Sequence, residues 1–288
     1  MNMKKNSTNK RLFLMAGYSA QQIVDTALIY MVRALAECGD VVLFMDSDVP
    51  NSELAKISKY TVYANAQRHG EYDFGSYKRA YTYARDTGIL KNYEFVYLIN
   101  DSVYGPLYPI APYFEKMESF NTPAFGLVWH PHKTSPHIQS WLIGMRPDVF
   151  LSTWFDEFIT SVTHQVDKGT VTYLYERGFT RQLETRNIPW RCMFAAPGRS
   201  IYNKIKKFYR MGLPFIKKCA FTRHNGRLGG QILYILNHIS PDARDSFLSA
   251  ARATYGDKYI TWLLTRNPFK IWLRNIKYFT HKICTEKL

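Results

Sequence analysis

Four short apolar runs divide the first hundred residues of the chain. Each has the length of a buried β-strand, and they cover residues 12–16, 41–45, 61–64 and 94–99. After the first run, apolar side chains recur at helical spacing before Gly39: Val24, Leu28, Met31 and Leu35. A short helix capped by Asn51 or Ser52 and a longer helix over residues 74–87 fill the next intervals. This alternation predicts an α/β fold with a mostly parallel sheet and helices on both faces.

The alternation stops after Asp101. Prolines interrupt the chain from there to about Arg146, at Pro106, Pro109, Pro112, Pro123, Pro131, Pro136 and Pro147. A connection this long inside a compact domain is usually functional, so we expect a long functional loop with short segments. Helical patterns resume over residues 149–166 and 171–186.

Polar residues follow each predicted strand, where open α/β sheets bind their ligands. They are Gly17-Tyr18-Ser19, Asp46-Ser47-Asp48, residues 68–73 and Asn100-Asp101-Ser102. The first predicted strand is not followed by G-x-G-x-x-G, and the chain contains no G-x-x-x-x-G-K-[ST]. These observations disfavour a dinucleotide-binding dehydrogenase and a phosphate-loop NTPase.

Asp101 follows the apolar run over residues 94–99 directly after Asn100. A carboxylate delivered there by a strand is suited to hold a divalent ion that bridges a pyrophosphate, because hard cations take oxygen ligands. An equally simple interpretation is a turn made by Asn100 and Asp101 before Gly105-Pro106. The residues alone leave both interpretations open.

Four motifs, within roughly residues 12–220, resemble those of the rhamnan-synthesis F proteins. They are Tyr72-Asp73-Phe74-Gly75-Ser76-Tyr77-Lys78, Leu98-Ile99-Asn100-Asp101-Ser102-Val103-Tyr104-Gly105-Pro106-Leu107, His137-Ile138-Gln139-Ser140-Trp141 and Tyr175-Glu176-Arg177-Gly178-Phe179-Thr180. The resemblance implies a GT-A-type glycosyltransferase that moves a sugar from a nucleotide-sugar donor. It favours rhamnose from dTDP-rhamnose, transferred with inversion onto a saccharide or lipid-linked acceptor in polysaccharide or lipopolysaccharide O-chain assembly.

The resemblance also implies a donor site. GT-A enzymes have an acidic D-x-D-like motif after the fourth strand, and Asn100, Asp101 and Ser102 stand at that place. Only Asp101 is acidic, so it is the predicted ligand of a divalent Mg²⁺ or Mn²⁺ ion, and the dependence on metal stays open. Asp46, in the literal D-x-D after the second strand, either touches the nucleoside or caps the helix after Pro50.

Further donor contacts are predicted on two basic segments. Asp73 is placed to bond the ribose or base, or else to cap the helix that follows it, and Lys78 or Arg79 to meet phosphate. Arg223 and Arg227 flank His224 in a glycine-containing basic loop, and guanidinium groups bind phosphate through two donors.

Glu176 is the predicted general base, because an inverting transferase must take a proton from the attacking acceptor hydroxyl. The alternative is a surface glutamate paired with Arg177 or Arg181, and Asp148 and Asp167 are weaker rivals for the base. His137, Gln139 and Ser140 are expected on the acceptor side. We interpret His130 and His132 as acceptor-loop residues rather than metal ligands, because their spacing with His137 is a weak metal signature.

The net charge of +15 is concentrated in the C-terminal third, which suggests a polyanionic partner. We divide the chain into a transferase domain over 1–220 and a basic, helical extension over 221–288. Two amphipathic segments could lie on anionic lipid or pack on the domain. The first has the apolar residues Ile201, Ile205 and Phe208; the second has Phe269, Trp272, Ile276, Phe279 and Ile283 beside Lys270, Arg274, Lys277 and Lys282.

The cysteines are scattered, at Cys38, Cys192, Cys219 and Cys284, and indicate reduced thiols in a cytosolic protein. No run of about 18 apolar residues is present. These features favour a cytoplasmic enzyme bound peripherally to the inner face of the cytoplasmic membrane. The alternatives are a nucleic-acid-binding protein, which the helical spacing of the aromatic residues disfavours, and a non-catalytic membrane scaffold.

Overall fold

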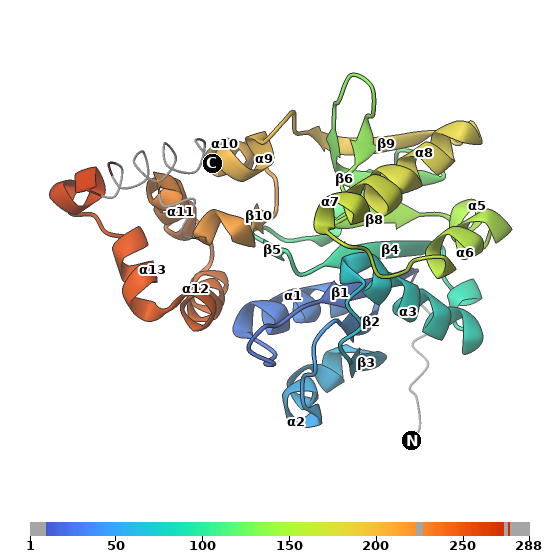
Figure 1. The fold of residues 1–288 in the computed structure, drawn as a ribbon, viewed down its shortest axis with the longest axis horizontal. Helices are drawn as coiled ribbons and strands as arrows, with labels where there is room; N and C mark the ends of the chain where they lie inside the picture. The colour runs from blue at the N-terminus through green and yellow to red at the C-terminus, as the bar shows by residue number, and fades with distance from the viewer. Residues whose placement is uncertain (1–9, 223–226, 274–275, 277–288) are drawn as a thin grey trace. The chain divides into compact units, whose positions relative to one another are not determined.

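The computed structural model describes residues 10–222, 227–273 and 276, and the chain forms two compact units (Figure 1). The first unit contains the residues up to Val24, Met31–Asp101 and Pro109–Gly198. The second contains Asp25–Tyr30, Ser102–Tyr108 and the residues from Arg199 onward. The division therefore falls at Gly198–Arg199, whereas the change in charge along the sequence suggested 220–221.

A single mixed sheet forms the centre of the first unit. Its strand order is β3-β2-β1-β4-β8-β6-β7, with β9 beside β6. The first four strands are parallel, namely β1 (Arg11–Gly17), β2 (Asp40–Met45), β3 (Tyr63–Ala66) and β4 (Phe95–Asn100). They match the four apolar runs to within two residues, so the predicted α/β fold and its GT-A-like parallel half are confirmed.

The proline-rich stretch after Asp101 supplies the other half of this sheet, and the expectation of a long loop is wrong. It forms β5 (Val103–Tyr104), α4 (Ala111–Glu118), β6 (Ala124–His130), β7 (His137–Ile138) and β8 (Leu142–Met145). Strand β8 pairs antiparallel with β4, β6 pairs antiparallel with β8, and β9 (Trp190–Ala195) adds parallel to β6. The prolines lie outside the strands, where no ladder hydrogen bond is lost.

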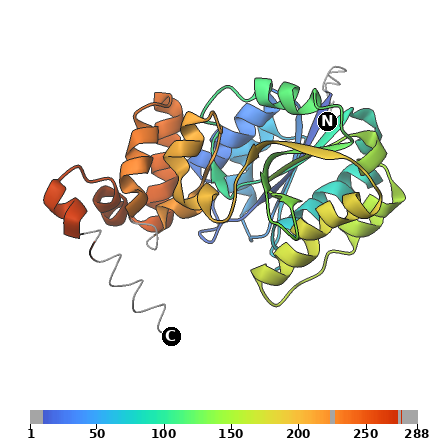
Figure 2. The same cartoon turned by 90° about the horizontal axis from the view of Figure 1, so that it is seen from above.

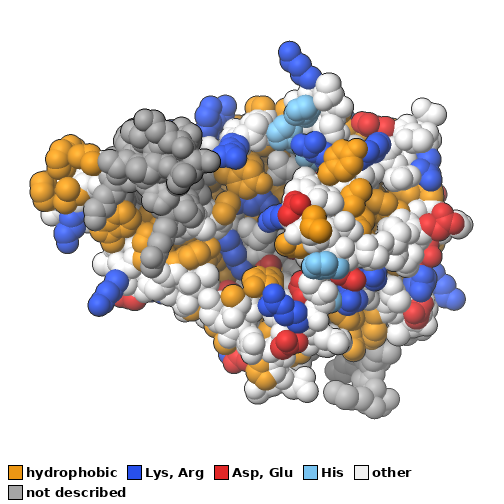
Figure 3. Space-filling model, in the orientation of Figure 1, with side chains coloured by type: hydrophobic (Ala, Val, Ile, Leu, Met, Phe, Trp, Pro, Cys, Tyr) orange, Lys and Arg blue, Asp and Glu red, His pale blue; other side chains and the backbone are white. Residues whose placement is uncertain are grey.

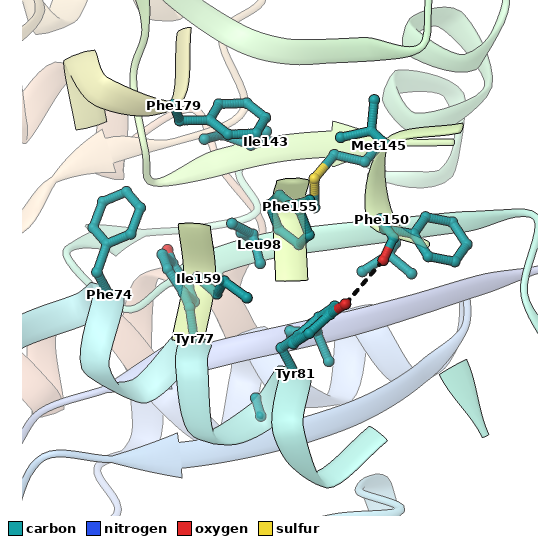
Figure 4. Close-up of a cluster of buried hydrophobic side chains, with 14 of the residues drawn as sticks. Phe74, Tyr77, Tyr81, Leu98, Ile143, Met145, Phe150, Phe155, Ile159 and Phe179 are labelled. Atoms are coloured by element: carbon teal, nitrogen blue, oxygen red, sulfur yellow. Dashed lines mark hydrogen bonds between the residues drawn. The ribbon is translucent and has the colours of Figure 1, made fainter. Parts of the chain in front are cut away.

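Helices cover both faces of the sheet (Figure 2). One face carries α3 (Tyr72–Asp86), α6 (Thr153–Thr160) and α8 (Arg177–Thr185), whose apolar side chains form one buried cluster with those of β1, β4 and β8 (Figure 4). The other face carries α4, where Phe114 packs against Phe13 and Tyr97. Alternate residues of β1 and β4 point to the two faces, so burying both requires both helix layers.

The remaining helical segments of the first unit are short, apart from α1 (Thr26–Ala36), whose first residues belong to the second unit. They are α2 (Asn51–Leu54), η1 (Ala55–Tyr60), η2 (Leu90–Asn92), α5 (Pro147–Phe150), α7 (Lys168–Val171) and η3 (Thr172–Glu176), a π-helical turn. The residue before α2 is Pro50 and no side chain caps this helix, so neither Asn51 nor Ser52 is its cap.

The second unit is mainly helical. It contains α9 (Ser200–Asn203), α10 (Ile205–Arg210), η4 (Lys218–Phe221), α11 (Gly229–Leu236), α12 (Pro241–Tyr255) and α13 (Asp257–Leu263), with β10 (Ile216–Lys217) antiparallel to β5. The apolar face of the first amphipathic segment is buried at Ile201, Ile205 and Phe208. Of the two alternatives for this segment, the structure therefore supports packing on its own unit rather than on lipid.

The ion pair between Arg11 and Glu118 ties β1 to α4. Nε of Arg11 donates to one carboxylate oxygen at 2.5 Å, Nη2 donates to the other at 2.8 Å, and the Tyr97 hydroxyl donates to the first at 2.6 Å. The hydrogen bond with Glu118 raises the pKa of Arg11. Both charged side chains are largely buried, so neither can turn to water if the other is lost.

We predict that Glu118→Gln lowers the free energy of unfolding by about 3 kcal/mol, because it leaves a largely buried guanidinium without its counter-charge. The exposed pair of Lys10 and Glu94 is the matched control, and Glu94→Gln should change the same quantity by less than about 1 kcal/mol. Urea unfolding of the three proteins measures both values. Equal effects of the two substitutions would contradict the structural role of the buried pair.

Candidate active site

Two backbone hydrogen bonds join the carboxyl ends of the parallel strands. The N–H of Asp46, which follows β2, donates to the carbonyl of Gly17 at 2.9 Å. The N–H of Asp101, which follows β4, donates to the carbonyl of Ala16 at 3.1 Å. Since Gly17 and Ala16 are the last residues of β1, both carboxylates start at the same edge of the sheet. This is the edge at which α/β sheets bind ligands.

The Asp46 carboxylate orders the loop after β3. Its Oδ1 accepts the N–H groups of His69 at 2.7 Å and Gly70 at 2.9 Å. Burial opposes ionisation, but these backbone donors lower the pKa of Asp46 below its ordinary value. Asp48 similarly accepts the N–H of Arg68. The literal D-x-D therefore holds a loop, and the alternative that Asp46 caps the helix after Pro50 is wrong.

This loop turns sharply into α3. Gly70 and Tyr72 both have positive φ, of 72° and 57°. Glycine adopts that conformation freely, whereas for tyrosine it is sparsely populated and often marks a functional loop. The His69 ring is fixed by Ser76 and by the N–H of Glu71, and burial lowers its pKa.

A side-chain hydrogen bond brings Asp73 to Asn100, the residue before Asp101. The Asn100 amide nitrogen donates to Oδ2 of Asp73 at 2.9 Å, and Asn100 and Asp101 are buried. Asp73 lies in the first turn of α3, whose N-cap residue is Glu71, so the interpretation of Asp73 as the helix cap is wrong. The chain does bend at Asp101 and Ser102, and a turn and a ligand site can coexist there.

Several predicted donor residues lie elsewhere. The Lys78 ammonium donates to the Val162 carbonyl at 2.6 Å and lies 3.4 Å from a Glu71 carboxylate oxygen, so it anchors α3 rather than meeting phosphate. Ser102 belongs to the second unit, where its hydroxyl accepts from Lys217. Arg227 is exposed in that unit, and Arg223 lies outside the described residues.

A surface pocket of the first unit lies away from this edge of the sheet. It has a volume of about 460 Å³ and contains none of the carboxylates at the sheet edge. Its lining residues are Phe44, Lys78, Arg79, Thr82, Tyr83, Asp86 and Thr87. Since Lys78 and Arg79 are both paired with Glu71, the pocket offers an anion little free positive charge.

Glu176 closes the π-helical turn η3 and is held by Ser140. Its Oε2 accepts the Ser140 N–H at 2.9 Å and the Ser140 hydroxyl at 2.5 Å. Its Oε1 lies 3.6 Å from Nε2 of His137, and the side chain is 20% exposed. Arg181 instead donates to the Tyr173 carbonyl and stacks over its ring, so the alternative of a surface glutamate paired with arginine is wrong. Single π turns of this kind often occur at functional sites.

The rival bases have other positions. Oδ1 of Asp167 accepts the Thr170 N–H at 3.0 Å and caps α7, which lowers the pKa of Asp167. Asp148 is exposed in the first turn of α5. Neither carboxylate is held in a polar cluster comparable to that around Glu176.

Three histidine rings line up beside Glu176. His137 is buried with Nδ1 at 2.9 Å from the Ser135 carbonyl, and the His130 ring stacks on it with centroids 5.2 Å apart. His132 follows, 5.9 Å from His130. Figure 3 shows histidine side chains at the surface over the β6–β7 hairpin. Gln139 is turned inward, where its side chain accepts from the Trp141 indole at 2.8 Å.

Two polar groups near this stack are unpartnered within the described part of the chain: His130, which the sequence placed in the acceptor loop, and Arg177, to which sequence reasoning gave no role in the site. Nδ1 of His130 and Nε of Arg177 are buried and have no hydrogen-bond partner among the residues that the structure describes. Burial, followed by the nearby His137, His132 and Arg177, lowers the pKa of His130. Arg177 directly follows Glu176 in the Tyr-Glu-Arg motif, and this position could have identified it from the sequence as a residue of the site.

The described residues include no group of three His, Cys, Asp or Glu side chains that could hold a metal ion. A divalent ion at Asp101 would therefore need most of its oxygen ligands from a substrate and from water. Magnesium is commonly bound in this way, through one or two carboxylates and the phosphates of a nucleotide. The residues fit a metal shared with a nucleotide, and they do not form a cage of their own.

Comparison with solved structures finds distant similarity. A nucleotide-diphospho-sugar transferase from Desulfovibrio desulfuricans G20 is 16% identical, over 71% of this chain and 88% of that chain, with a TM-score of 0.40. A glycosyltransferase involved in glycosylation of the major capsid of PBCV-1 is 11% identical, over 73% and 94%, with 0.37. Core-mannan synthase A from Aspergillus fumigatus, in an Mn/GDP form, is 11% identical, over 66% and 74%, with 0.36. At these TM-scores the likeness assigns no activity or ligand to this chain.

Comparison with curated proteins finds no match. The family described as rhamnan synthesis protein F matches residues 41–284. This range includes the strands from β2 onward but not β1, and it includes the carboxylates at the sheet edge, Glu176 and most of the second unit. The chain belongs to the rhamnan synthesis protein F family.

Proposed function

We propose that this protein is a glycosyltransferase that moves rhamnose, with inversion, from dTDP-rhamnose onto a growing cell-surface polysaccharide or lipopolysaccharide glycan. Family membership supports the transfer of a sugar from a nucleotide-sugar donor. The observation that carries the proposal is the geometry at Glu176, whose carboxylate is oriented by Ser140 and His137 within the same unit as the carboxylates at the sheet edge.

In the proposed reaction an acceptor hydroxyl attacks the anomeric carbon of the donor sugar, while Glu176 takes the hydroxyl proton. The bond from the anomeric carbon to the diphosphate breaks, and dTDP leaves with the electron pair. A single displacement inverts the configuration and needs no covalent enzyme intermediate. The two hydrogen bonds from Ser140 fix Oε2 of Glu176, so the carboxylate is oriented before the substrates meet.

Asp46, Asp73, Asn100 and Asp101 are the proposed donor-binding residues. Asp73 and Asn100 can hold hydroxyl groups of the nucleotide, and Asp101 can hold a divalent ion against its diphosphate. A bound Mg²⁺ or Mn²⁺ would supply positive charge for the departing diphosphate. Lys78 is not among the proposed donor residues, because its ammonium is already bound by the Val162 carbonyl and the Glu71 carboxylate.

On the acceptor side, His137 and Ser140 contact Glu176. The unpartnered nitrogen atoms of His130 and Arg177 are buried, so an acceptor oxygen could bond to them only after the side chains around them move. Gln139 is the exception among the predicted acceptor residues, since its side chain is buried against Trp141.

The aromatic residues of the basic region do not favour the nucleic-acid alternative. Stacking on bases requires exposed rings. Between residues 201 and 222, all of which the structure describes, only the ring of Tyr202 is exposed, and the following rings are buried: Phe208, Tyr209, Phe215 and Phe221.

We also propose that the second amphipathic segment holds the enzyme at the inner face of the cytoplasmic membrane, near a lipid-linked acceptor. Phe269 and Trp272 are 66% and 56% exposed, and Figure 3 shows hydrophobic side chains at the surface over the helix drawn red in Figure 1. This exposure argues against packing on the domain. Arg274, Lys277, Phe279, Lys282 and Ile283 lie outside the described residues. Among the described residues, no helix combines the length and hydropathy needed to cross a bilayer.

We predict that dTDP-rhamnose raises the melting temperature of the protein, and more strongly with Mg²⁺ or Mn²⁺. A ligand at a hundredfold excess over its Kd adds about 2.7 kcal/mol to the free energy of unfolding. Asp101→Asn should remove most of this shift, whereas Asp148→Asn, on the exposed first turn of α5, should retain it. If no nucleotide sugar or nucleoside diphosphate stabilises the wild type, with or without metal, the proposal of a donor site at the sheet edge is wrong.

We predict that Glu176→Gln lowers kcat by about 10²- to 10⁴-fold, because the amide can no longer accept the proton. The assay follows dTDP release from dTDP-rhamnose, with water as the acceptor. The substitution keeps an oxygen that accepts from Ser140, so the melting temperature should change little. Glu157→Gln, an exposed position on α6, is the control and should be fully active. Near wild-type turnover by Glu176→Gln would exclude it as the base.

We predict that replacing both Phe269 and Trp272 by serine reduces co-sedimentation with anionic lipid vesicles and leaves the melting temperature unchanged. Exposed side chains contribute little to folding, but they add apolar area to an interface to which each basic residue contributes about 1 kcal/mol. Leu151→Ser, at an equally exposed leucine of the first unit, is the control. Unchanged sedimentation with a large fall in melting temperature would rule out the anchor.

A further inference from the structure

Tyr77 lies between the predicted donor residues and the predicted base. It is on α3, its side chain is fully buried, and Figure 4 shows it within the core beneath β4 and β8. Its hydroxyl donates to the Ser140 carbonyl at 2.9 Å and shares a hydrogen bond with the Asn100 side chain. The phenol therefore joins a strand-end residue of β4 to the segment between β7 and β8.

A continuous series of hydrogen bonds passes through this phenol. On one side, Asn100 donates to Oδ2 of Asp73 at 2.9 Å. On the other, Ser140 accepts from Tyr77 through its carbonyl and donates to Glu176 through its N–H and hydroxyl. The series connects side chains from α3, β4, the β7–β8 connection and η3, all within the first unit.

The charge around Tyr77 keeps its proton on the oxygen. Burial raises the pKa of Tyr77 well above its ordinary value, and the negative charges of Asp73, Glu176 and Asp101 raise it further. The hydroxyl is therefore a permanent donor at working pH. The proposed function assigns the ribose, the acceptor proton and the metal to these three carboxylates.

We propose that Tyr77 is a positioning residue that couples the donor side of the site to the base, an inference that rests on the proposed function. The phenol holds the Ser140 peptide, and that peptide holds the Glu176 carboxylate. When the nucleotide sugar contacts Asp73 or Asn100, the effect of that contact reaches Ser140 through the same hydroxyl. Glu176 is thus aligned in the complex that already contains the nucleotide sugar, and a small misalignment there lowers the rate without weakening donor binding.

The same helix contains a matched control. Tyr81 lies one turn further along α3, is also buried, and donates its hydroxyl to a backbone carbonyl, that of Phe150, at 3.2 Å (Figure 4). Its edge packs on Phe155, as the edge of Tyr77 packs on Phe74. The Tyr81 hydroxyl also shares a hydrogen bond with the Asp156 side chain of α6. Neither Phe150, a core residue at the end of α5, nor Asp156 belongs to the proposed site, so the Tyr81 hydroxyl supports the fold alone.

Tyr77→Phe and Tyr81→Phe should lower the melting temperature to a similar extent, because each leaves one buried carbonyl without its side-chain donor. Only Tyr77→Phe should lower kcat for dTDP-rhamnose hydrolysis, by about 10- to 100-fold, with KM for the donor nearly unchanged. In a Glu176→Gln background, Tyr77→Phe should have almost no further effect on kcat, because it acts through the base that is already lost.

Two results would overturn the coupling while the proposed function stands. In the first, Tyr77→Phe and Tyr81→Phe have the same kcat, although Glu176→Gln by itself inactivates the enzyme. The other is a multiplicative loss in the Tyr77→Phe and Glu176→Gln double variant, which would show that Tyr77 acts independently of the base. A wild type that releases no dTDP contradicts the proposed function itself, and the coupling with it.

Discussion

The parallel register of β1, β2 and β4 is the constraint on which the candidate site depends. Asp46 and Asp101 leave their strands next to the end of β1, and their backbone N–H groups complete its last hydrogen bonds. Both carboxylates are thereby fixed at one edge by the sheet itself. A slip of one residue in either strand would turn the alternating side chains to opposite faces and empty the core of Figure 4. Burial of the apolar side chains stabilises this register, and it therefore also fixes the positions of the polar residues at the sheet edge.

Polar groups at this edge are bound mainly by the protein itself. Asp46 accepts two backbone donors from the loop after β3, Asn100 is bonded to Asp73, and Glu176 is bonded to Ser140. A carboxylate held in this way has lost most of its rotational freedom before a ligand arrives. Preorganised groups are more effective than mobile ones in binding and catalysis, because the entropy of ordering them is lost on folding. The nitrogen atoms of His130 and Arg177 differ, since they are buried without a partner in the described part of the chain.

The antiparallel half of the sheet contributes the side chains that contact Glu176, which the parallel half does not supply. Strands β6, β7 and β8 bring His137 and Ser140 to Glu176, while the phenol of Tyr77 reaches the same segment from α3. The two halves meet at the β4–β8 pairing, in the middle of the sheet. The proposed donor residues thus come from the regular half, and the proposed base and its partners come from the half that departs from simple alternation.

Local sequence patterns determined the α/β class, the parallel strands and the placement of Asp46, Asp73 and Asp101 after strands. Strand and helix periodicities are properties of neighbouring residues, and the rule that loops meet at the carboxyl edge converts them into position. The same reasoning failed over residues 101–146, because short strands between prolines carry too few residues to show a period. Only the tertiary structure decided that Ser140 holds Glu176 from 36 residues away and that Lys78 meets the Val162 carbonyl from 84 residues away. Such contacts depend on how the layers pack, and local periodicity contains no record of a partner so distant along the chain.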